Sequence, residues 1–341
     1  MSEPLVVIDA DVLGRQRTGD ETYVRSLLHA LAEAKPNDLR LAAITRRPDL
    51  VPDGIEPIEL PARSQVARMA FSVPRLLRRL RPALAHFVHA LPLACPCPAV
   101  VTIQDLSFER DASVMGTRDR LIFRVAVPRA ARRATRVLAI SELTKRDLVE
   151  LYGIPEQKIT VTPLAADPSF CPEGPSMDGE PYALFVGALQ QRKQATTAIE
   201  ALSLVGEGAP RLVLVGPDKG GRAEVEETAA RLGVPVELRG HLPQDELAAL
   251  YRGAACLVFP SRYEGFGLPL LEAMASGTPV VATRAGALPE VAGEAAILVE
   301  PGNPAALADH ERLRESGLAR AARYSWAETA RLTLAVYREL L

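Results

Sequence analysis

The side chains best suited to chemistry lie in one run, Phe259–Met274, that follows an apolar stretch. Two glycines flank an aromatic residue there, Glu264 precedes them, and Glu272 follows further on. A helix that begins at the second glycine offers backbone N–H groups and its dipole to an anion, and a carboxylate one turn into it can accept hydrogen bonds from ribose hydroxyls. The run predicts a phosphate and ribose site made of Glu264, Gly265, Phe266, Gly267, Leu268 and Glu272. A plain turn with solvated glutamates is the alternative on spacing alone.

A second candidate group, Gly187–Lys193, follows the apolar stretch Tyr182–Val186 and precedes a helical pattern. Arg192 can bind phosphate through two parallel hydrogen bonds, and Lys193 supplies a compact positive charge. Fixed cations aimed at a departing diphosphate lower the barrier to its departure. Because cations are disfavoured at a helix start, we expect Gly187, Arg192 and Lys193 to face a bound anion rather than solvent.

Short apolar runs alternate with amphipathic stretches along the whole chain, which predicts buried parallel strands covered by helices on both faces. The linker-like segment Asp167–Glu180 is rich in proline and glycine and separates two such sets. We therefore expect two doubly wound α/β domains, residues 1–170 and 171–325, and a last helix over 326–341 that returns to the first domain. Ligands bind at the carboxyl ends of such strands. The expected strands are Leu5–Ile8, Leu39–Ile44, Leu84–Val88, Val100–Ile103, Arg136–Ile140, Tyr182–Val186, Leu212–Val215, Val236–Leu238, Cys256–Phe259, Val280–Thr283 and Ala296–Val299.

The composition is that of a globular protein that needs no staple: 341 residues, 48% hydrophobic and 24% charged. The four cysteines form no C-x-x-C pair, and neither a signal peptide nor a membrane-length apolar run is present. These features predict free thiols in a reducing, cytoplasmic compartment. No G-x-G-x-x-G follows the first strand and no G-x4-G-K-[ST] occurs, which disfavours a dehydrogenase and a P-loop kinase.

Two further groups of polar residues in the first half of the chain could form a catalytic or metal site. Asp9 and Asp11 end the first strand and could act as paired carboxylates, although capping of the loop Gly14–Gly19 is favoured; Gly19 is the acceptor-side candidate in that loop. His86, His89, Cys95 and Cys97 have the atoms of a zinc site but not its usual spacing, so no metal is expected. His89 is retained as an acceptor-side contact.

The stretch between Glu59 and Asp105 contains no acidic residue and six arginines from Arg63 to Arg81, with apolar residues between them. Such a pattern suits the anionic inner surface of a membrane, and an ordinary helix with a basic solvated face is favoured slightly over it. Pro74 interrupts the expected helix. A second basic group, Arg129–Arg136, is expected to be solvated. The arginines lack interleaved stacking aromatics, so nucleic acid is not an expected partner.

The combination of motifs resembles the retaining family 4 glycosyltransferases, which have the GT-B fold of two Rossmann-like domains facing across a cleft. The resemblance covers most of the chain. Besides Gly187, the Arg192–Lys193 pair and the Glu264–Glu272 segment, it is carried by Thr18–Tyr23, Phe259–Ser261, Ala273–Ala275, Gly277–Val281 and Pro289–Gly293.

This resemblance implies a role for each matching residue. Arg192 and Lys193 would bind the donor diphosphate, Glu272 the ribose, and Glu264 with the Gly265–Gly267 backbone the transferred sugar. His241 and Leu242 would lie near the base. The implied reaction is metal-independent, retaining transfer of a hexosyl unit, mannosyl by preference with GDP-mannose as donor, to a saccharide or lipid-linked acceptor. An epimerase or synthase on the same fold is the alternative.

Three departures from the family pattern are present. Gln104 precedes Asp105 where histidine is common, and glutamine cannot take a proton near neutral pH. Gln104 and Asp105 are still expected at the reacting sugar, with Gln104 orienting it; a non-catalytic binder of sugar nucleotides is the other interpretation. Ala188 stands where relatives carry an arginine, and the segment Ala305–Leu318 is short for the helix pair expected there.

Overall fold

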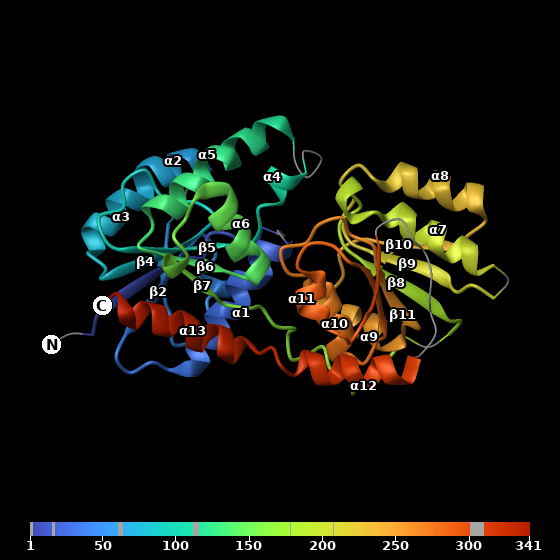
Figure 1. Ribbon diagram of the computed structural model, residues 1–341. Coiled ribbons are helices and arrows are strands. Elements are labelled where there is room, and N and C mark those ends of the chain that lie inside the picture. Colours follow the sequence, from blue (N-terminus) through green and yellow to red (C-terminus); the bar gives the residue numbers. More distant parts are fainter. Residues whose placement is uncertain are drawn as a thin grey trace. The chain divides into compact units, whose positions relative to one another are not determined.

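The computed structural model describes residues 3–15, 18–60, 64–111, 116–177, 179–206, 208–300 and 310–341. The chain forms two compact units (Figure 1). Unit 1 comprises Met1–Leu106, Thr117–Leu164 and Ser325–Leu341, and unit 2 comprises Ser107–Gly116 and Ala165–Tyr324.

Unit 1 is built on a sheet of seven parallel strands in the order β3-β2-β1-β4-β5-β6-β7. The strand Ala99–Ile103 is buried at every position, because a parallel sheet is covered on both faces and its strands become continuous apolar runs. The seven strands are β1 (Leu5–Asp9), β2 (Arg40–Thr45), β3 (Glu56–Glu59), β4 (Leu84–Val88), β5 (Ala99–Ile103), β6 (Arg136–Ala139) and β7 (Ile159–Val161).

Helices cover both faces of this sheet, with α2, α3 and α5 on one side and α1 and α13 on the other (Figure 1). The longer helices of unit 1 are α1 (Thr18–Ala34), α3 (Val73–Leu80), α5 (Thr117–Arg133), α6 (Glu142–Tyr152) and α13 (Trp326–Glu339). The short α2 (Gln65–Ala67) continues through a π-helical turn over Arg68–Ser72 into α3, whose first turn contains Pro74. Proline suits that first turn because its missing N–H has no partner there.

Helix α13 packs on α1 within unit 1. Its side chain cap is Ser325, whose hydroxyl accepts from Glu328 N at 3.1 Å. Near its other end the Tyr337 hydroxyl contacts His86 Nδ1 at 2.5 Å, deep in the sheet. The last helix of the chain therefore completes the core of the unit that contains the first strand.

Unit 2 has a six-stranded parallel sheet in the order β10-β9-β8-β11-β12-β13. Helices α7 and α8 pack on one face, as the apolar cluster of β8, β9, α7 and α8 shows. Its strands are β8 (Tyr182–Val186), β9 (Arg211–Val215), β10 (Val236–Arg239), β11 (Cys256–Phe259), β12 (Val280–Thr283) and β13 (Ile297–Val299). Its helices are α4 (Ser107–Arg110), α7 (Ala195–Val205), α8 (Arg222–Leu232), α9 (Gln244–Gly253), α10 (Leu268–Ala275), α11 (Leu288–Ala292) and α12 (His310–Ala321).

Two doubly wound α/β units confirm the predicted fold class, and every expected strand is present. The sequence pattern missed the two edge strands of unit 1: β3, whose residues Glu-Pro-Ile-Glu are mostly exposed, and the three-residue β7. It also missed α5, which contains Pro128 and carries apolar residues on its outer face. Of the doubtful segment Ala305–Leu318, residues 305–309 lie outside the described part, and the remainder belongs to α12.

Candidate functional site

The sheet order of unit 2 creates a switch point between β8 and β11, which pair with each other while their chain neighbours lie on opposite sides. Loops that leave the carboxyl ends of such strands diverge and form a ligand-binding crevice. The predicted residues Gly187 and Lys193 follow β8, and Glu264 follows β11. The topology therefore brings both candidate groups to the same point of the sheet.

At this point two cations meet one carboxylate. Lys193 Nζ lies 2.6 Å from Glu264 Oε1, and Arg192 Nη1 lies 3.2 Å from the same oxygen. Arg192 also donates to the carbonyl oxygen of Tyr263, and the Lys193 ammonium lies 5.1 Å from the centre of the Phe259 ring. All three charged side chains are about nine-tenths buried. We refer to Arg192, Lys193 and Glu264 as the ion cluster.

The ion cluster has a net positive charge at any ordinary pH. Burial alone would raise the pKa of Glu264, but the charges of Lys193 and Arg192 outweigh burial and lower this pKa to about 2. The carboxylate therefore stays ionised and holds both cations in place. Two cations beside one carboxylate at the carboxyl edge of a sheet favour an anionic ligand.

Glycines without room for a side chain hold the backbone of this region. Gly286 has φ +57, and a Cβ there would lie 2.5 Å from the carbonyl oxygen of Glu264. Ala287 N donates to that same oxygen at 2.9 Å. Gly267 has φ +101, and a Cβ there would lie 2.5 Å from Leu288 Cδ2. The turn after β12 thus supports Glu264, a role for Gly286 that sequence reasoning missed because its signal is spatial.

Glu272 lies on α10 and is half-buried. Its Oε2 accepts a hydrogen bond of 2.8 Å from the Tyr251 hydroxyl on α9. Burial raises the pKa of Glu272 to about 7, and the Tyr251 hydrogen bond only partly opposes that rise. This carboxyl group, unlike Glu264, changes charge near neutral pH, and its recorded partner is Tyr251 rather than the ion cluster.

The other predicted donor residues are placed as follows. His241 is exposed and Leu242 half-buried in the loop between β10 and α9. The Phe266 ring is buried against Tyr324, with ring centroids 5.8 Å apart. This leaves the backbone of Gly265, Phe266, Gly267 and Leu268, at the start of α10, as the part of the turn that can meet a ligand.

In unit 1 the structure brings together Gly19, His89 and Gln104. The Nε2 atom of His89 lies 3.3 Å from Asp20 Oδ1, and a Cβ on Gly19 would lie 3.8 Å from Gln104 Oε1. Burial lowers the pKa of His89, but the hydrogen bond that its ring donates to Asp20 and the charges of Asp20 and Asp105 raise it above its usual value. His89 and Asp105 thus share one electrostatic environment.

Two nitrogen atoms of this group are buried and have no hydrogen-bond partner among the described residues: Gln104 Nε2 and His89 Nδ1. A buried polar nitrogen without a partner is uncommon and costs free energy. Gln104 is held by its backbone, because Thr144 Oγ1 donates to its carbonyl oxygen at 3.1 Å. Both nitrogens can hydrogen-bond a polyhydroxylated ligand.

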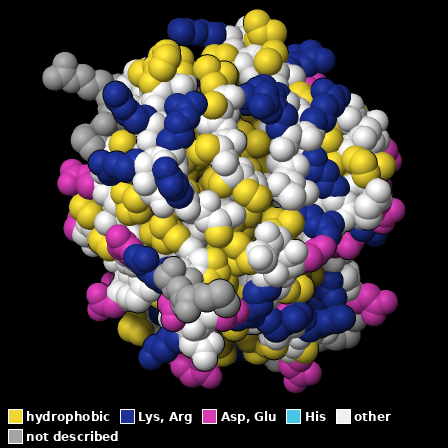
Figure 2. All heavy atoms as spheres, turned by 90° about the vertical axis from the view of Figure 1, so that its left-hand side faces the viewer, with side chains coloured by type: hydrophobic (Ala, Val, Ile, Leu, Met, Phe, Trp, Pro, Cys, Tyr) yellow, Lys and Arg dark blue, Asp and Glu magenta, His cyan; other side chains and the backbone are white. Residues whose placement is uncertain are grey.

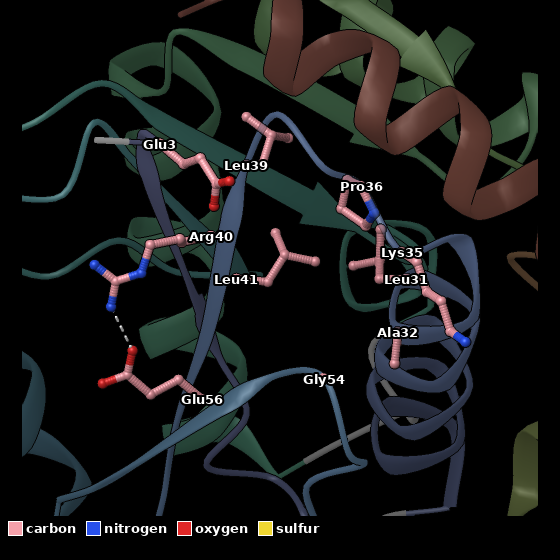
Figure 3. A pocket seen from close by; sticks show the side chains of 10 residues that line it. All are labelled: Glu3, Leu31, Ala32, Lys35, Pro36, Leu39, Arg40, Leu41, Gly54 and Glu56. Atoms are coloured by element: carbon pink, nitrogen blue, oxygen red, sulfur yellow. Dashed lines mark hydrogen bonds and ion pairs between the residues drawn. The ribbon is translucent and has the colours of Figure 1, made fainter. Parts of the chain in front are cut away.

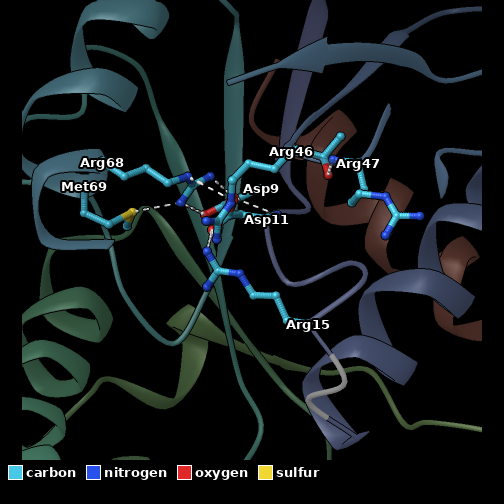
Figure 4. A network of polar contacts seen from close by, with 8 residues as sticks. Asp9, Asp11, Arg15, Arg46, Arg47, Arg68 and Met69 are labelled. Atoms are coloured by element: carbon cyan, nitrogen blue, oxygen red, sulfur yellow. Dashed lines mark hydrogen bonds and ion pairs between the residues drawn. The ribbon is translucent and has the colours of Figure 1, made fainter. Parts of the chain in front are cut away.

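Asp9 and Asp11 are neither a proton-transfer pair nor simple loop caps. Arg68 pairs with Asp9, Arg15 pairs with Asp11, and Arg46 Nε lies 2.8 Å from Asp11 Oδ1 (Figure 4). Arg68 is fully buried. Sequence reasoning placed Arg68 on a basic surface and missed this role, because the partners are far apart along the chain.

One residue of the zinc alternative, His86, is buried in the core of unit 1, and both of its ring nitrogens have partners there. His86 Nε2 contacts Thr102 Oγ1 at 2.7 Å, and its other ring nitrogen contacts Tyr337. Burial lowers the pKa of His86 to about 3. Within the described residues no group of three or more potential ligands could hold a metal ion.

In the second basic group Arg132 and Arg133 are exposed, as expected, whereas Arg129 and Arg136 are half-buried. Arg129 donates to the carbonyl oxygens of Leu91, Pro92 and Leu93, and Arg132 to that of Tyr152. Arg63 of the first basic stretch lies outside the described residues.

A cavity of about 360 Å³ lies at the amino ends of β1, β2 and β3, beside the end of α1 (Figure 3). Its lining includes Lys35 and the exposed Arg40–Glu56 ion pair, whose atoms are 2.9 Å apart. None of the predicted site residues lines it. Doubly wound proteins bind their ligands at the carboxyl ends of the strands. This cavity lies at the amino ends, so it is not the candidate site.

Comparisons with known proteins agree with this arrangement. A family model described as Glycosyltransferase Family 4 matches residues 17–170, and one described as Glycosyl transferases group 1 matches residues 180–312. Together the two matches cover most of the chain.

Two curated relatives illustrate the similarity. O-antigen chain mannosyltransferase B of Escherichia coli is 30% identical over 231 residues, which are 60% of either chain. D-inositol 3-phosphate glycosyltransferase of Nocardia farcinica is 33% identical over 240 residues, 61% of this chain and 53% of the relative. The aligned part thus spans little more than half the length of these relatives.

Solved structures share the fold along the whole chain. Sucrose-phosphate synthase of Thermosynechococcus elongatus superposes with a TM-score of 0.80 at 21% identity, covering 99% of both chains. Anabaena HepE, solved in complex with UDP and glucose, gives 0.75 at 18% identity and covers both chains fully. With the two-unit GT-B architecture and the two family matches, this chain belongs to the family 4, group 1 glycosyltransferases.

Proposed function

We propose that this protein transfers a sugar from a nucleotide-diphosphate donor held by unit 2 to an acceptor held by unit 1. The observation that carries the proposal is the ion cluster at the switch point of unit 2, where two cations face one ionised carboxylate. A diphosphate gains negative charge as the sugar leaves. Fixed cations and helix-start N–H groups that are already in position stabilise that charge without reorganisation.

We further propose a hexosyl donor, with GDP-mannose preferred, and retention of configuration. The name of the Escherichia coli relative supports a mannosyl unit, whereas HepE was solved with UDP and glucose. Lys193 and Arg192 supply the positive charge that a metal ion supplies elsewhere, which supports metal-independent transfer.

The acid–base properties of the site favour attack on the donor face from which the phosphate leaves. Glu264, with a pKa of about 2, is a weak proton acceptor, and Gln104 cannot accept a proton. The acceptor hydroxyl oxygen forms the new bond to the anomeric carbon as the bond to phosphate breaks, and its proton passes to the departing phosphate oxygen. Glu264 then serves the transferred sugar by accepting hydrogen bonds and by fixing Lys193.

Glu272 is proposed to bind the ribose, and His241 and Leu242 the base. On the acceptor side we propose Gly19 and His89, with a saccharide or lipid-linked acceptor, and at the reacting sugar Gln104 and Asp105. The unpartnered nitrogens of Gln104 and His89 support hydroxyl binding there. A lipid-linked acceptor requires the enzyme to work at a bilayer surface.

The test is transfer and donor binding with GDP-mannose, UDP-glucose and their nucleotides, comparing wild type with Lys193→Met and a control, Lys219→Met. Lys219 is an exposed lysine of the same unit. We expect Lys193→Met to lower kcat by about 100-fold or more, as for loss of one oxyanion-stabilising group, and the control to leave it unchanged.

The anomeric configuration of the product, read by NMR, tests retention. Nucleotide binding without any turnover in the presence of a panel of saccharide and lipid-linked acceptors supports the non-catalytic alternative suggested by Gln104. Equal kcat for wild type and Lys193→Met would refute the role of the ion cluster.

A further inference from the structure

Unit 1 exposes a group of large apolar side chains on the face that carries α2, α3 and α5. Phe71 is 74% exposed, Leu121 66% and Val125 63%. The full group, which we call the apolar face, is Val66, Phe71, Leu93, Leu121, Ile122 and Val125. Clustered exposed apolar residues mark interaction sites, whereas scattered ones do not.

These residues form one surface although they come from three segments. The backbone N–H of Leu93 donates to the carbonyl oxygen of Met69 at 3.1 Å, and Arg129 of α5 donates to the carbonyl oxygen of Leu93 at 3.0 Å. Leu93 therefore joins the π-helical turn that carries Phe71 to α5. On α5, Leu121, Ile122 and Val125 share the outward face by their helical spacing.

The apolar face lies at the same sheet edge as the proposed acceptor residues. Segment 65–72 precedes α3, and α5 begins at Thr117, so both helical segments start at the carboxyl edge of the parallel sheet. Phe123, between the exposed residues of α5, packs its ring 5.9 Å from that of His89. One side of the first half of α5 thus faces His89, and the other side faces solvent.

The apolar face is bordered by positive charge. Segments 65–80 and 117–133 together contain ten arginines and a single acidic residue, Asp119. Exposed arginines of these segments include Arg75, Arg78, Arg79 and Arg118. The space-filling view shows Lys and Arg side chains around hydrophobic patches in its upper half and again at its lower right, with acidic side chains mainly along the margins (Figure 2).

We propose that the apolar face docks on an anionic lipid bilayer, with its apolar side chains in the interface and the bordering arginines on lipid headgroups. Apolar side chains ringed by basic ones are the pattern of proteins that lie on such surfaces. A second copy of this chain is a poorer occupant, because pairing the same face on both copies would oppose arginine to arginine. Nucleic acid is disfavoured because Phe71 is the only aromatic residue of the group.

The test is sedimentation of the full chain with vesicles of pure phosphatidylcholine or with 30% phosphatidylglycerol, without donor or acceptor. We expect binding to the anionic vesicles, weak binding to the neutral ones, and loss of most binding in 0.5 M salt. The double variant Leu121→Ser/Val125→Ser should lower the vesicle partition coefficient by about tenfold or more, and Arg75→Glu/Arg78→Glu by a similar factor, since each basic residue near an anionic surface contributes about fivefold.

Matched controls use unit 2. Leu204 is 69% exposed on α7, and Arg231 is exposed on α8, so Leu204→Ser and Arg231→Glu remove similar groups outside the apolar face and should bind like wild type. Circular dichroism verifies that all variants fold. Unchanged binding of both double variants, or a concentration-dependent dimer that Leu121→Ser/Val125→Ser disperses, overturns the proposal. Because vesicle binding is measured without sugar transfer, its outcome is independent of the proposed enzymatic activity.

Discussion

Burial affects two glutamates of unit 2, yet their pKa values are shifted in opposite directions. Lys193 and Arg192 lower the pKa of Glu264 to about 2, whereas Glu272, with a neutral tyrosine as partner, has its pKa raised to about 7. Unit 2 therefore contains two different carboxyl groups. Glu264 stays charged and holds cations, whereas Glu272 is neutral for part of the physiological pH range. Partners, rather than residue type, decide the charge.

Donor affinity is expected to depend on pH through Glu272. If its carboxylate accepts the ribose hydroxyls, binding strengthens as pH rises from 6 to 8, because the ionised form is the better acceptor. The measurement is the dissociation constant of GDP by calorimetry across this range, for wild type and Glu272→Gln. Glu272→Gln should bind GDP more weakly than wild type at pH 8. Its dissociation constant should also change less with pH, because the Glu272 carboxyl group no longer titrates.

The stability of the protein gives an independent check of the Glu272 pKa, because stability is expected to fall with rising pH whereas donor affinity is expected to rise. The folded-state pKa of Glu272 lies above that of an unfolded glutamate, so the folded state binds more protons and stability falls as pH rises from about 4.5 through 7. Glu272→Gln should gain stability relative to wild type by on the order of 2 kcal/mol between pH 5 and 8. Parallel stability curves for the two proteins would contradict the raised pKa.

At the scale of elements, the turn after β12 and the turn before α10 act as one support. Gly286 approaches the Glu264 backbone, and Gly267 approaches Leu288 on α11. A Cβ on Gly286 would meet backbone atoms of Glu264, whereas one on Gly267 would meet the end of the Leu288 side chain. The position of Glu264 therefore depends on a contact between two loops that follow neighbouring strands.

Gly286→Ala is expected to weaken GDP binding by about tenfold and to lower the free energy of unfolding by about 1–3 kcal/mol, because its Cβ would displace Glu264 and its φ is strained. The control is Gly233→Ala. Gly233 has φ +67 and no atom within 4 Å of an added Cβ, so it carries the strain without the clash. If both variants bind GDP like wild type, the turn does not position Glu264.

At the scale of the whole molecule, the proposed tasks are divided between units that have separate sheets and cores. Unit 2 carries the ion cluster, and unit 1 carries Gln104, His89 and the apolar face. Among the described residues no helix is long and apolar enough to cross a bilayer. Docking of unit 1 through surface side chains would bring the acceptor residues to a lipid-linked substrate.

Hydrogen exchange measured by mass spectrometry should give two separate footprints. GDP is expected to slow exchange after β8, β11 and β12, over residues 187–193, 260–272 and 284–288, since a bound ligand stabilises the segments it contacts. Anionic vesicles should instead slow exchange in the described residues of 64–72 and 117–125. Nucleotide protection that is confined to unit 1 would contradict the assignment of the donor to unit 2.

Much of this architecture follows from local patterns. Apolar runs bounded by breakers predicted all strands of both sheets except the edge strands β3 and β7, and the glycine and glutamate spacing predicted the run that forms the turn before α10. The edge strand β3 escaped because exposed residues and a proline carry no apolar signal. Helix α5 escaped because its exposed face is apolar where a solvated face should be polar.

The α/β class, the two sets of alternating elements and the types of side chain available for binding follow from local sequence, since periodicity and motif spacing are properties of neighbouring residues. The contact of Lys193 with Glu264, the burial of Arg68 on Asp9 and the link that Leu93 makes between Phe71 and α5 arise only on folding. These contacts join residues far apart along the chain. Their charge states and exposure therefore depend on strand order and packing, which no local pattern contains.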